Sequence, residues 1–99
     1  MTEKLDPIPP GEILLEEFMK PLGVSQNRLS RDIDVPVSRV AAIVKGQRSI
    51  TADTALRLAR YFGTTPQLWL NMQSAYDLRL LRARDWSEIE KRIRPLNAA

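Results

Sequence analysis

The residues best suited to chemistry lie between Val37 and Arg48, where small side chains are followed by basic ones. At helical spacing, Ser38, Ala41 and Ala42 share one face with Lys45, and Arg39 flanks that face. A face meant only for water normally carries longer charged side chains, whereas a shallow cationic face fits a groove in a polyanion. The pattern therefore predicts binding to DNA through contacts to bases and phosphates.

The residue types that are missing exclude most catalytic and metal chemistry. The chain has no cysteine and no histidine, so disulfides, Cys/His zinc sites, Ser-His-Asp triads and histidine bases are all excluded. Glu12 and Glu16 have the i, i+4 spacing of a paired-carboxylate site, and Asp53 is a further acid. A solvated acidic face, or a docking face for a basic protein, explains the glutamates better. We predict no enzyme activity, no metal and no cofactor.

The charge is unevenly distributed along the 99 residues, whose net charge is +3. Residues 1–24 hold two basic and five acidic groups, whereas residues 25–60 hold seven basic and three acidic groups. The positive excess begins at about residue 25, in the stretch that includes the shallow face, which suits a polyanionic partner, with a solvated surface as the alternative. The N-terminus has no apolar run and no stretch is long enough to span a membrane. We therefore expect a soluble cytoplasmic protein.

Two short helices joined by a tight turn are expected to position the shallow face. Ser25 is placed as the N-cap of the first, and residues 34–36 break the pattern, with Pro36 suited to the start of the second. Val40 and Ile43 give the second helix an apolar stripe opposite the shallow face, and Gly46 ends it. Helices this short are unstable alone and must pack on others.

The rest of the chain predicts further helices and no strand. Helices are expected over residues 10–20, from Thr51 as N-cap to Phe62, from Thr65 to about Leu81, and over residues 86–93. Glu12, Arg57 and Arg60 are expected on outer faces, and Asp53 in the first turn of its helix, where an acidic residue suits the helix dipole. The fold class is all-α: a five-helix, repressor-like helix-turn-helix domain with a short C-terminal helical tail. The organisation is an N-terminal arm over 1–9, the domain over 10–81 and the tail over 82–99.

The helix that begins at Thr65 is apolar on more than one side, so it needs more than one partner. One side completes the core, and the other is expected to meet a second copy of the chain, with a wider core as the alternative. The candidate dimer residues are Trp69, Met72, Gln73, Tyr76 and Leu80. A 99-residue chain buries a modest share of its surface, so pairing would add stability.

Four stretches resemble the HigA family of antitoxins, also known as virulence-associated protein I. They are PGEIL at 10–14, LGVS at 22–25, GQRSITADTA at 46–55 and WLN at 69–71. The resemblance covers about residues 8–81. It implies a repressor fold, a homodimer, binding to an operator in double-stranded DNA, and inhibition of a small HigB-like ribonuclease toxin. One departure is Asp34, where the family usually has glycine, although aspartate tolerates a positive φ better than most residues.

The same resemblance assigns DNA contacts along the two short helices. Gln26 and Asn27 would touch phosphate, and Val37, Ser38, Arg39 and Ala42 would face bases or the adjacent backbone. Lys45, Gln47 and Arg48 would hold the backbone after the second helix. On chemical grounds Arg39 is the best candidate for a directional contact, to guanine. The alternative function is a stand-alone repressor-type transcriptional regulator without a toxin partner.

Overall fold

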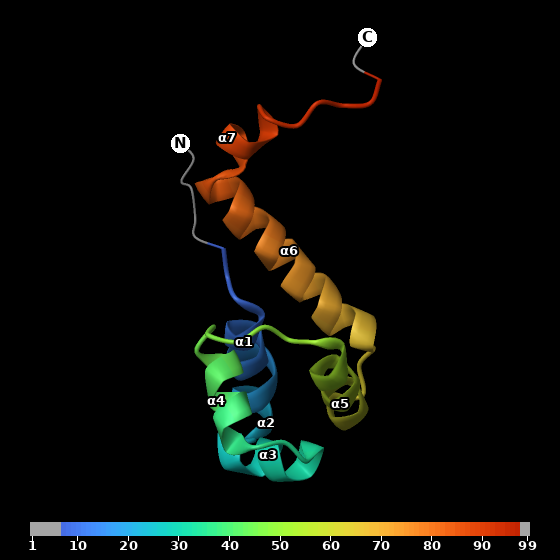
Figure 1. The fold of residues 1–99 in the computed structure, drawn as a ribbon. Helices are drawn as coiled ribbons and strands as arrows, with labels where there is room; N and C mark the ends of the chain where they lie inside the picture. Colours follow the sequence, from blue (N-terminus) through green and yellow to red (C-terminus); the bar gives the residue numbers. More distant parts are fainter. Residues whose placement is uncertain (1–6, 98–99) are drawn as a thin grey trace.

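The computed structural model describes residues 7–97, and these residues form helices and loops with no strand. Figure 1 shows a bundle of helices from which α6 projects, with α7 at its far end. The molecule is elongated, with principal extents of 54 × 34 × 22 Å. The expected all-α class and helix-turn-helix arrangement are confirmed. Most of the predicted arm, residues 1–6, lies outside the described residues.

The first helix is continuous through α1 (Pro10–Ile13), η1 (Leu14–Met19) and α2 (Lys20–Leu22), and η1 is π-helical. Pro10 opens it as predicted. Pro21 and Gly23 are both helix-stopping residues after the predicted end at about Lys20. Pro21 instead lies inside the last turn, so the helix runs on to Leu22, and Gly23, with φ 67°, ends it. The π-helical turn shifts the carbonyl groups before Pro21 out of the usual register, which accommodates a residue without an N–H.

The helix-turn-helix consists of α3 (Gln26–Ile33) and α4 (Val37–Val44). The Ser25 hydroxyl accepts a hydrogen bond from the Arg28 N–H at 3.0 Å, so the predicted N-cap is confirmed. Asp34 ends α3 with φ 60° and is the only non-glycine with positive φ among residues 7–97. Pro36 is itself the N-cap of α4 and precedes its first turn.

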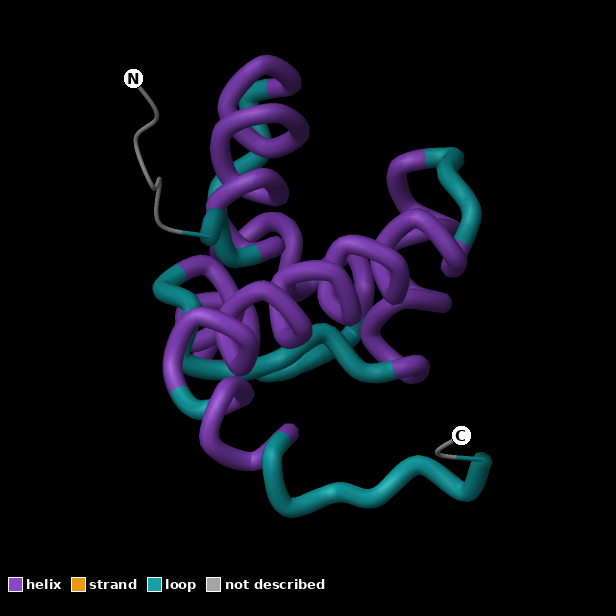
Figure 2. The backbone as a smooth tube through the Cα atoms, turned by 90° about the horizontal axis from the view of Figure 1, so that it is seen from above, coloured by secondary structure: helices purple, strands orange, loops and turns teal. Residues whose placement is uncertain are grey.

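The remaining helices are α5 (Ala52–Phe62), α6 (Pro66–Arg84) and α7 (Trp86–Glu90). Thr65 caps α6 by accepting from the Leu68 N–H at 3.2 Å, whereas Thr51 precedes α5 without a side-chain cap. α6 extends beyond the predicted end at Leu81 to Arg84. α7 ends before the predicted Ile93 and has no capping box, and an extended segment follows it (Figure 2).

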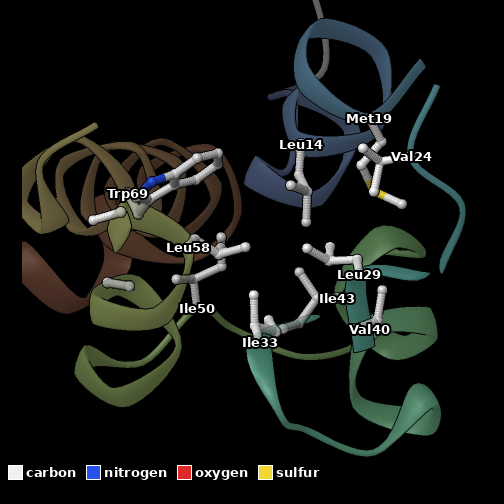
Figure 3. Packing of buried hydrophobic residues seen from close by; sticks show 12 residues of the cluster. Leu14, Met19, Val24, Leu29, Ile33, Val40, Ile43, Ile50, Leu58 and Trp69 are labelled. Atoms are coloured by element: carbon white, nitrogen blue, oxygen red, sulfur yellow. The ribbon is translucent and has the colours of Figure 1, made fainter. Parts of the chain in front are cut away.

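The core lies where the helices of the bundle meet, and Figure 3 shows its side chains converging from α3, α4, α5 and the first helix. The most buried large residues are Trp69, Leu14, Met19, Leu29, Leu58 and Val40. Trp69 at the start of α6 is fully buried and donates from its indole N–H to the Thr64 hydroxyl at 2.8 Å. Trp69 therefore fixes α6 to the bundle.

Two of the expected dimer residues belong to this core. Gln73 is buried, and its Oε1 accepts from the buried Ile50 N–H at 2.8 Å while its Nε2 donates to Asp77. Trp69 and Gln73 thus have no surface left for a second copy, which corrects that expectation. Met72, Tyr76 and Leu80 are only partly buried. No helix within residues 7–97 is both long and apolar enough to cross a membrane.

Candidate nucleic-acid interface

The shallow face of α4 lies at the surface. Val40 and Ile43 are 2% exposed and hold α4 against the core. On the opposite side Val37 is 43% exposed, and Ser38 and Lys45 are exposed as well. Ala41 and Ala42 are half-buried and nearly flat. This arrangement leaves the α4 backbone accessible to the floor of a groove, since no long side chain stands above it.

The N-terminus of α3 presents the two residues expected to touch phosphate. Gln26 is half-buried and Asn27 is exposed, both in the first turn of a helix whose N-cap is formed. A helix N-terminus carries partial positive charge and free N–H groups, which favour an anion nearby. The geometry is thus compatible with a phosphate at this end of α3.

The segment after α4 uses its first two backbone donors to close the helix and exposes its side chains. Gly46, with φ 76°, allows its N–H to donate to the Ile43 carbonyl at 3.0 Å, and the Gln47 N–H donates to the Ala42 carbonyl at 2.8 Å. These two N–H groups therefore close the end of α4 and are not available to a ligand. The side chains of Lys45, Gln47 and Arg48 are exposed.

Arg39 is not free at the surface. Its Nη1 donates to Asp53 Oδ2 of α5 at 3.1 Å, and its side chain is 25% exposed. Its Nε is buried and has no hydrogen-bond partner among the described residues. The guanidinium therefore lies against the protein and presents only part of its donor set to solvent.

Arg57 on α5 links that helix to the helix-turn-helix, which corrects the expectation that it points outward. Its Nε donates to both Asp53 oxygens at 3.1 and 3.2 Å. Its Nη1 donates to the carbonyl groups of Ile33 and Asp34 at 2.8 and 3.0 Å. These carbonyls lie at the C-terminal end of α3, where a cation is favoured by the helix dipole. The i, i+4 spacing of Asp53 and Arg57 was a sequence signal for half of this network.

A second polar cluster joins α3 to α5 one helical turn further along the face that carries Arg57. The Tyr61 hydroxyl donates to Asp32 Oδ2 at 2.8 Å, and Arg28 Nε is 3.4 Å from the same oxygen. The hydrogen bond to Asp32 raises the pKa of Tyr61 above its ordinary value, with desolvation as a further cause, because it stabilises the neutral phenol. The cluster thus ties the outer surface of α3 to α5.

The acidic residues considered as a catalytic or metal site do not assemble into one. Glu16 Oε2 is paired with Lys20 Nζ at 2.9 Å, and Asp53 is held by two arginines. Within residues 7–97 no three acidic side chains come close enough together to ligate a metal. The interface of α3, α4 and the following loop is thus the candidate functional site.

Comparison with known proteins identifies similar chains. Residues 15–69 match the helix-turn-helix family model. The chain is 59% identical over 73 residues to virulence-associated protein I of Dichelobacter nodosus, covering 74% of this chain and 68% of that protein. It is 37% identical over 93 residues to antitoxin HigA-1 of Vibrio cholerae, covering 94% and 87%. The structure of Pseudomonas aeruginosa antitoxin HigA with the higBA promoter matches with a TM-score of 0.86 and 46% identity, covering 91% and 98%.

Proposed function

The chain belongs to the HigA family of helix-turn-helix proteins, and on this basis we propose that it is an antitoxin that represses its own operon as a homodimer. Members of this family are DNA-binding antitoxins and regulators, so the chain is not an enzyme. The observation that carries the proposal is the shallow α4 face, which is exposed beside basic side chains. The similar HigA structure with promoter DNA supports it.

In the proposed complex, α4 enters the major groove of operator DNA. Val37, Ser38 and Ala42 face the bases, where the apolar side chains meet thymine methyl groups, and Arg39 contacts guanine. The contacts to the sugar-phosphate backbone come from Gln26, Asn27, Lys45, Gln47 and Arg48. In a homodimer the two α4 helices read half-sites about one helical turn apart.

Fluorescence anisotropy with the chain's own upstream DNA and with random DNA tests this proposal. Arg39→Ala should weaken operator binding by about 1–3 kcal/mol and relax the sequence preference. Lys45→Ala or Arg48→Ala should weaken binding to operator and to random DNA by the same factor. Each should also reduce by about one the slope of the logarithm of the binding constant against the logarithm of the salt concentration. Equal losses on operator and random DNA for Arg39→Ala would remove its base-reading role. Equal affinity of the unchanged protein for both DNAs would refute sequence-specific repression.

The homodimer is proposed to form through the outer part of α6. Leu78 is 52% and Leu81 is 41% exposed, and with Trp86 they line an open cavity of about 260 Å³. Met72, Tyr76 and Leu80 remain candidates for the same interface. Light scattering should give the molecular mass of two chains. Leu78→Glu should reduce the measured mass to that of one chain if this surface is the interface. Glu16→Gln, which changes a different surface, is the matched control.

Toxin neutralisation is the second half of the proposal. The first helix carries Glu12, Glu16 and Glu17 on exposed positions, which suits a basic, RNA-cleaving partner. Co-expression with the neighbouring small open reading frame should rescue growth and give a complex that purifies as one species. Absence of both rescue and co-purification would leave a stand-alone repressor, which is the alternative function.

A further inference from the structure

Asp53 lies outside the helix-turn-helix but contacts α4, the helix proposed to enter the major groove. It is in the first turn of α5, and its Oδ2 receives both Arg39 Nη1 and Arg57 Nε. Arg39 lies fourteen residues away in the sequence, on α4. A carboxylate facing a DNA-binding surface would repel phosphates, so its position there needs an explanation.

The carboxylate is fixed independently of Arg39. Arg57 makes two contacts to Asp53 with its Nε, and its Nη1 is in turn bound by the carbonyls of Ile33 and Asp34. Two backbone acceptors in the turn of the helix-turn-helix thus fix Arg57, and Arg57 fixes Asp53. Asp53 therefore presents one oxygen to Arg39 from a defined point relative to α4.

Arg39 is consequently restricted to one orientation. One N–H of its Nη1 is donated to Asp53, and its Nε is buried without a partner among the described residues. Its Nη2 makes no hydrogen bond within residues 7–97 and is not among the buried atoms. This end of the guanidinium is therefore the part that faces away from Asp53 and can meet a ligand while the contact to Asp53 is kept. A guanidinium held in this way can bind a correctly placed base edge but cannot swing to an arbitrary phosphate.

We propose that Asp53 is a positioning residue for sequence reading, which, supported by Arg57, holds Arg39 so that its free end meets a base acceptor and is withheld from phosphates. The proposal rests on the function proposed above. It makes Asp53 a determinant of specificity that touches no DNA itself. Without the carboxylate, Arg39 gains freedom to bind any phosphate within reach.

The test compares Asp53→Asn with Asp32→Asn in the full chain, using operator and random DNA at several salt concentrations. Both substitutions raise the net charge by one and remove the carboxylate of an i, i+4 pair with arginine, but Asp32 does not contact Arg39. Asp53→Asn should reduce the ratio of operator to random affinity at least about fivefold. It should also steepen the salt slope on random DNA by about 0.9 per chain. Asp32→Asn should change the ratio less than about twofold, since it adds only unspecific attraction.

A double variant distinguishes the positioning of Arg39 by Asp53 from a general structural effect of the Asp53 substitution. In an Arg39→Ala background, Asp53→Asn should leave the ratio unchanged, because there is no guanidinium to position. Asp53→Ser, which keeps a residue suited to the first turn of a helix, serves as a second variant if the asparagine variant is unstable. An equal effect of Asp53→Asn and Asp32→Asn, or an undiminished effect without Arg39, would overturn the proposal. Failure of the unchanged protein to prefer the operator would instead refute the proposed function.

Discussion

Gly11→Ala is the substitution that most directly tests how α4 is held in place. A Cβ at residue 11 would lie 1.7 Å from the Ile43 carbonyl oxygen, 2.6 Å from its carbon and 3.0 Å from Val44 Cα. All three atoms are backbone, so no rotamer change relieves the overlap. α1 and α4 must separate by roughly 1.7 Å or more before an ordinary contact distance is restored. Gly11 is thus required for close packing rather than for its dihedral freedom.

The expected cost follows from two opposing terms. Overpacking costs about 1–3 kcal/mol, and rigid backbone places this site at the upper end. Alanine returns up to about 1 kcal/mol because it favours a helix more than glycine does. The net loss of about 2 kcal/mol should lower Tm by roughly 8–16 °C in a domain of this size. Thermal unfolding followed by circular dichroism measures it.

Gly63→Ala is the matched control for Gly11→Ala. Gly63 has φ 73°, and no atom lies within 4 Å of the point that an alanine Cβ would occupy. Alanine there costs only left-handed strain, about 1–2 kcal/mol. Below its lowered Tm, the Gly11→Ala protein should also bind operator DNA more weakly, because α4 has moved. A Tm for Gly11→Ala equal to or above that of the unchanged protein would refute the packing argument.

Three further outcomes follow from contacts described above. Gln73→Met should lower the free energy of unfolding, measured with urea, by about 1–3 kcal/mol, because the buried Ile50 N–H loses its acceptor. Tyr61 should titrate above 10.0 by tyrosinate absorbance, and Asp32→Asn should lower that pKa. Because the folded-state pKa of Tyr61 is raised, its contribution to stability is complete below the unfolded pKa and is lost as the pH rises through the folded pKa. Asp34→Gly should raise stability by up to about 1 kcal/mol in the same unfolding assay, since glycine adopts φ 60° without strain.

The helices could be predicted because local signals mark their ends. Ser25 and Thr65 form their caps, and Gly63 and Gly46 adopt positive φ where the sequence pattern places helix ends. The same pattern predicts too short a first helix, since Pro21 usually breaks a helix and nothing local marks the π-helical turn before it.

The candidate site was predictable only in part, and the limit is again physical. Helical periodicity correctly placed Ser38 and Lys45 on the exposed side of α4. It could not show that Arg39 is paired with Asp53, because that contact depends on how α5 packs beside α4. The burial of Gln73 against Ile50, twenty-three residues away, was missed for the same reason.

α6 is anchored to the bundle through its first half. Trp69 and Gln73 are its only buried residues among those described, and they occupy its first half. Tyr76 and Arg79 still line cavities with the first helix and the segment before it, so the part of α6 that projects beyond the bundle is residues 80–84. This part is about 8 Å long at the rise of an α-helix. A small tilt of α6 at Trp69 displaces the C-terminal end of the helix more than its N-terminal end. Substitutions in residues 80–84, by contrast, leave the packing of α4 unchanged. In the homodimer proposed above, substitutions at this end of α6 would change the distance between the two subunits without altering the proposed DNA-contacting surface of α4.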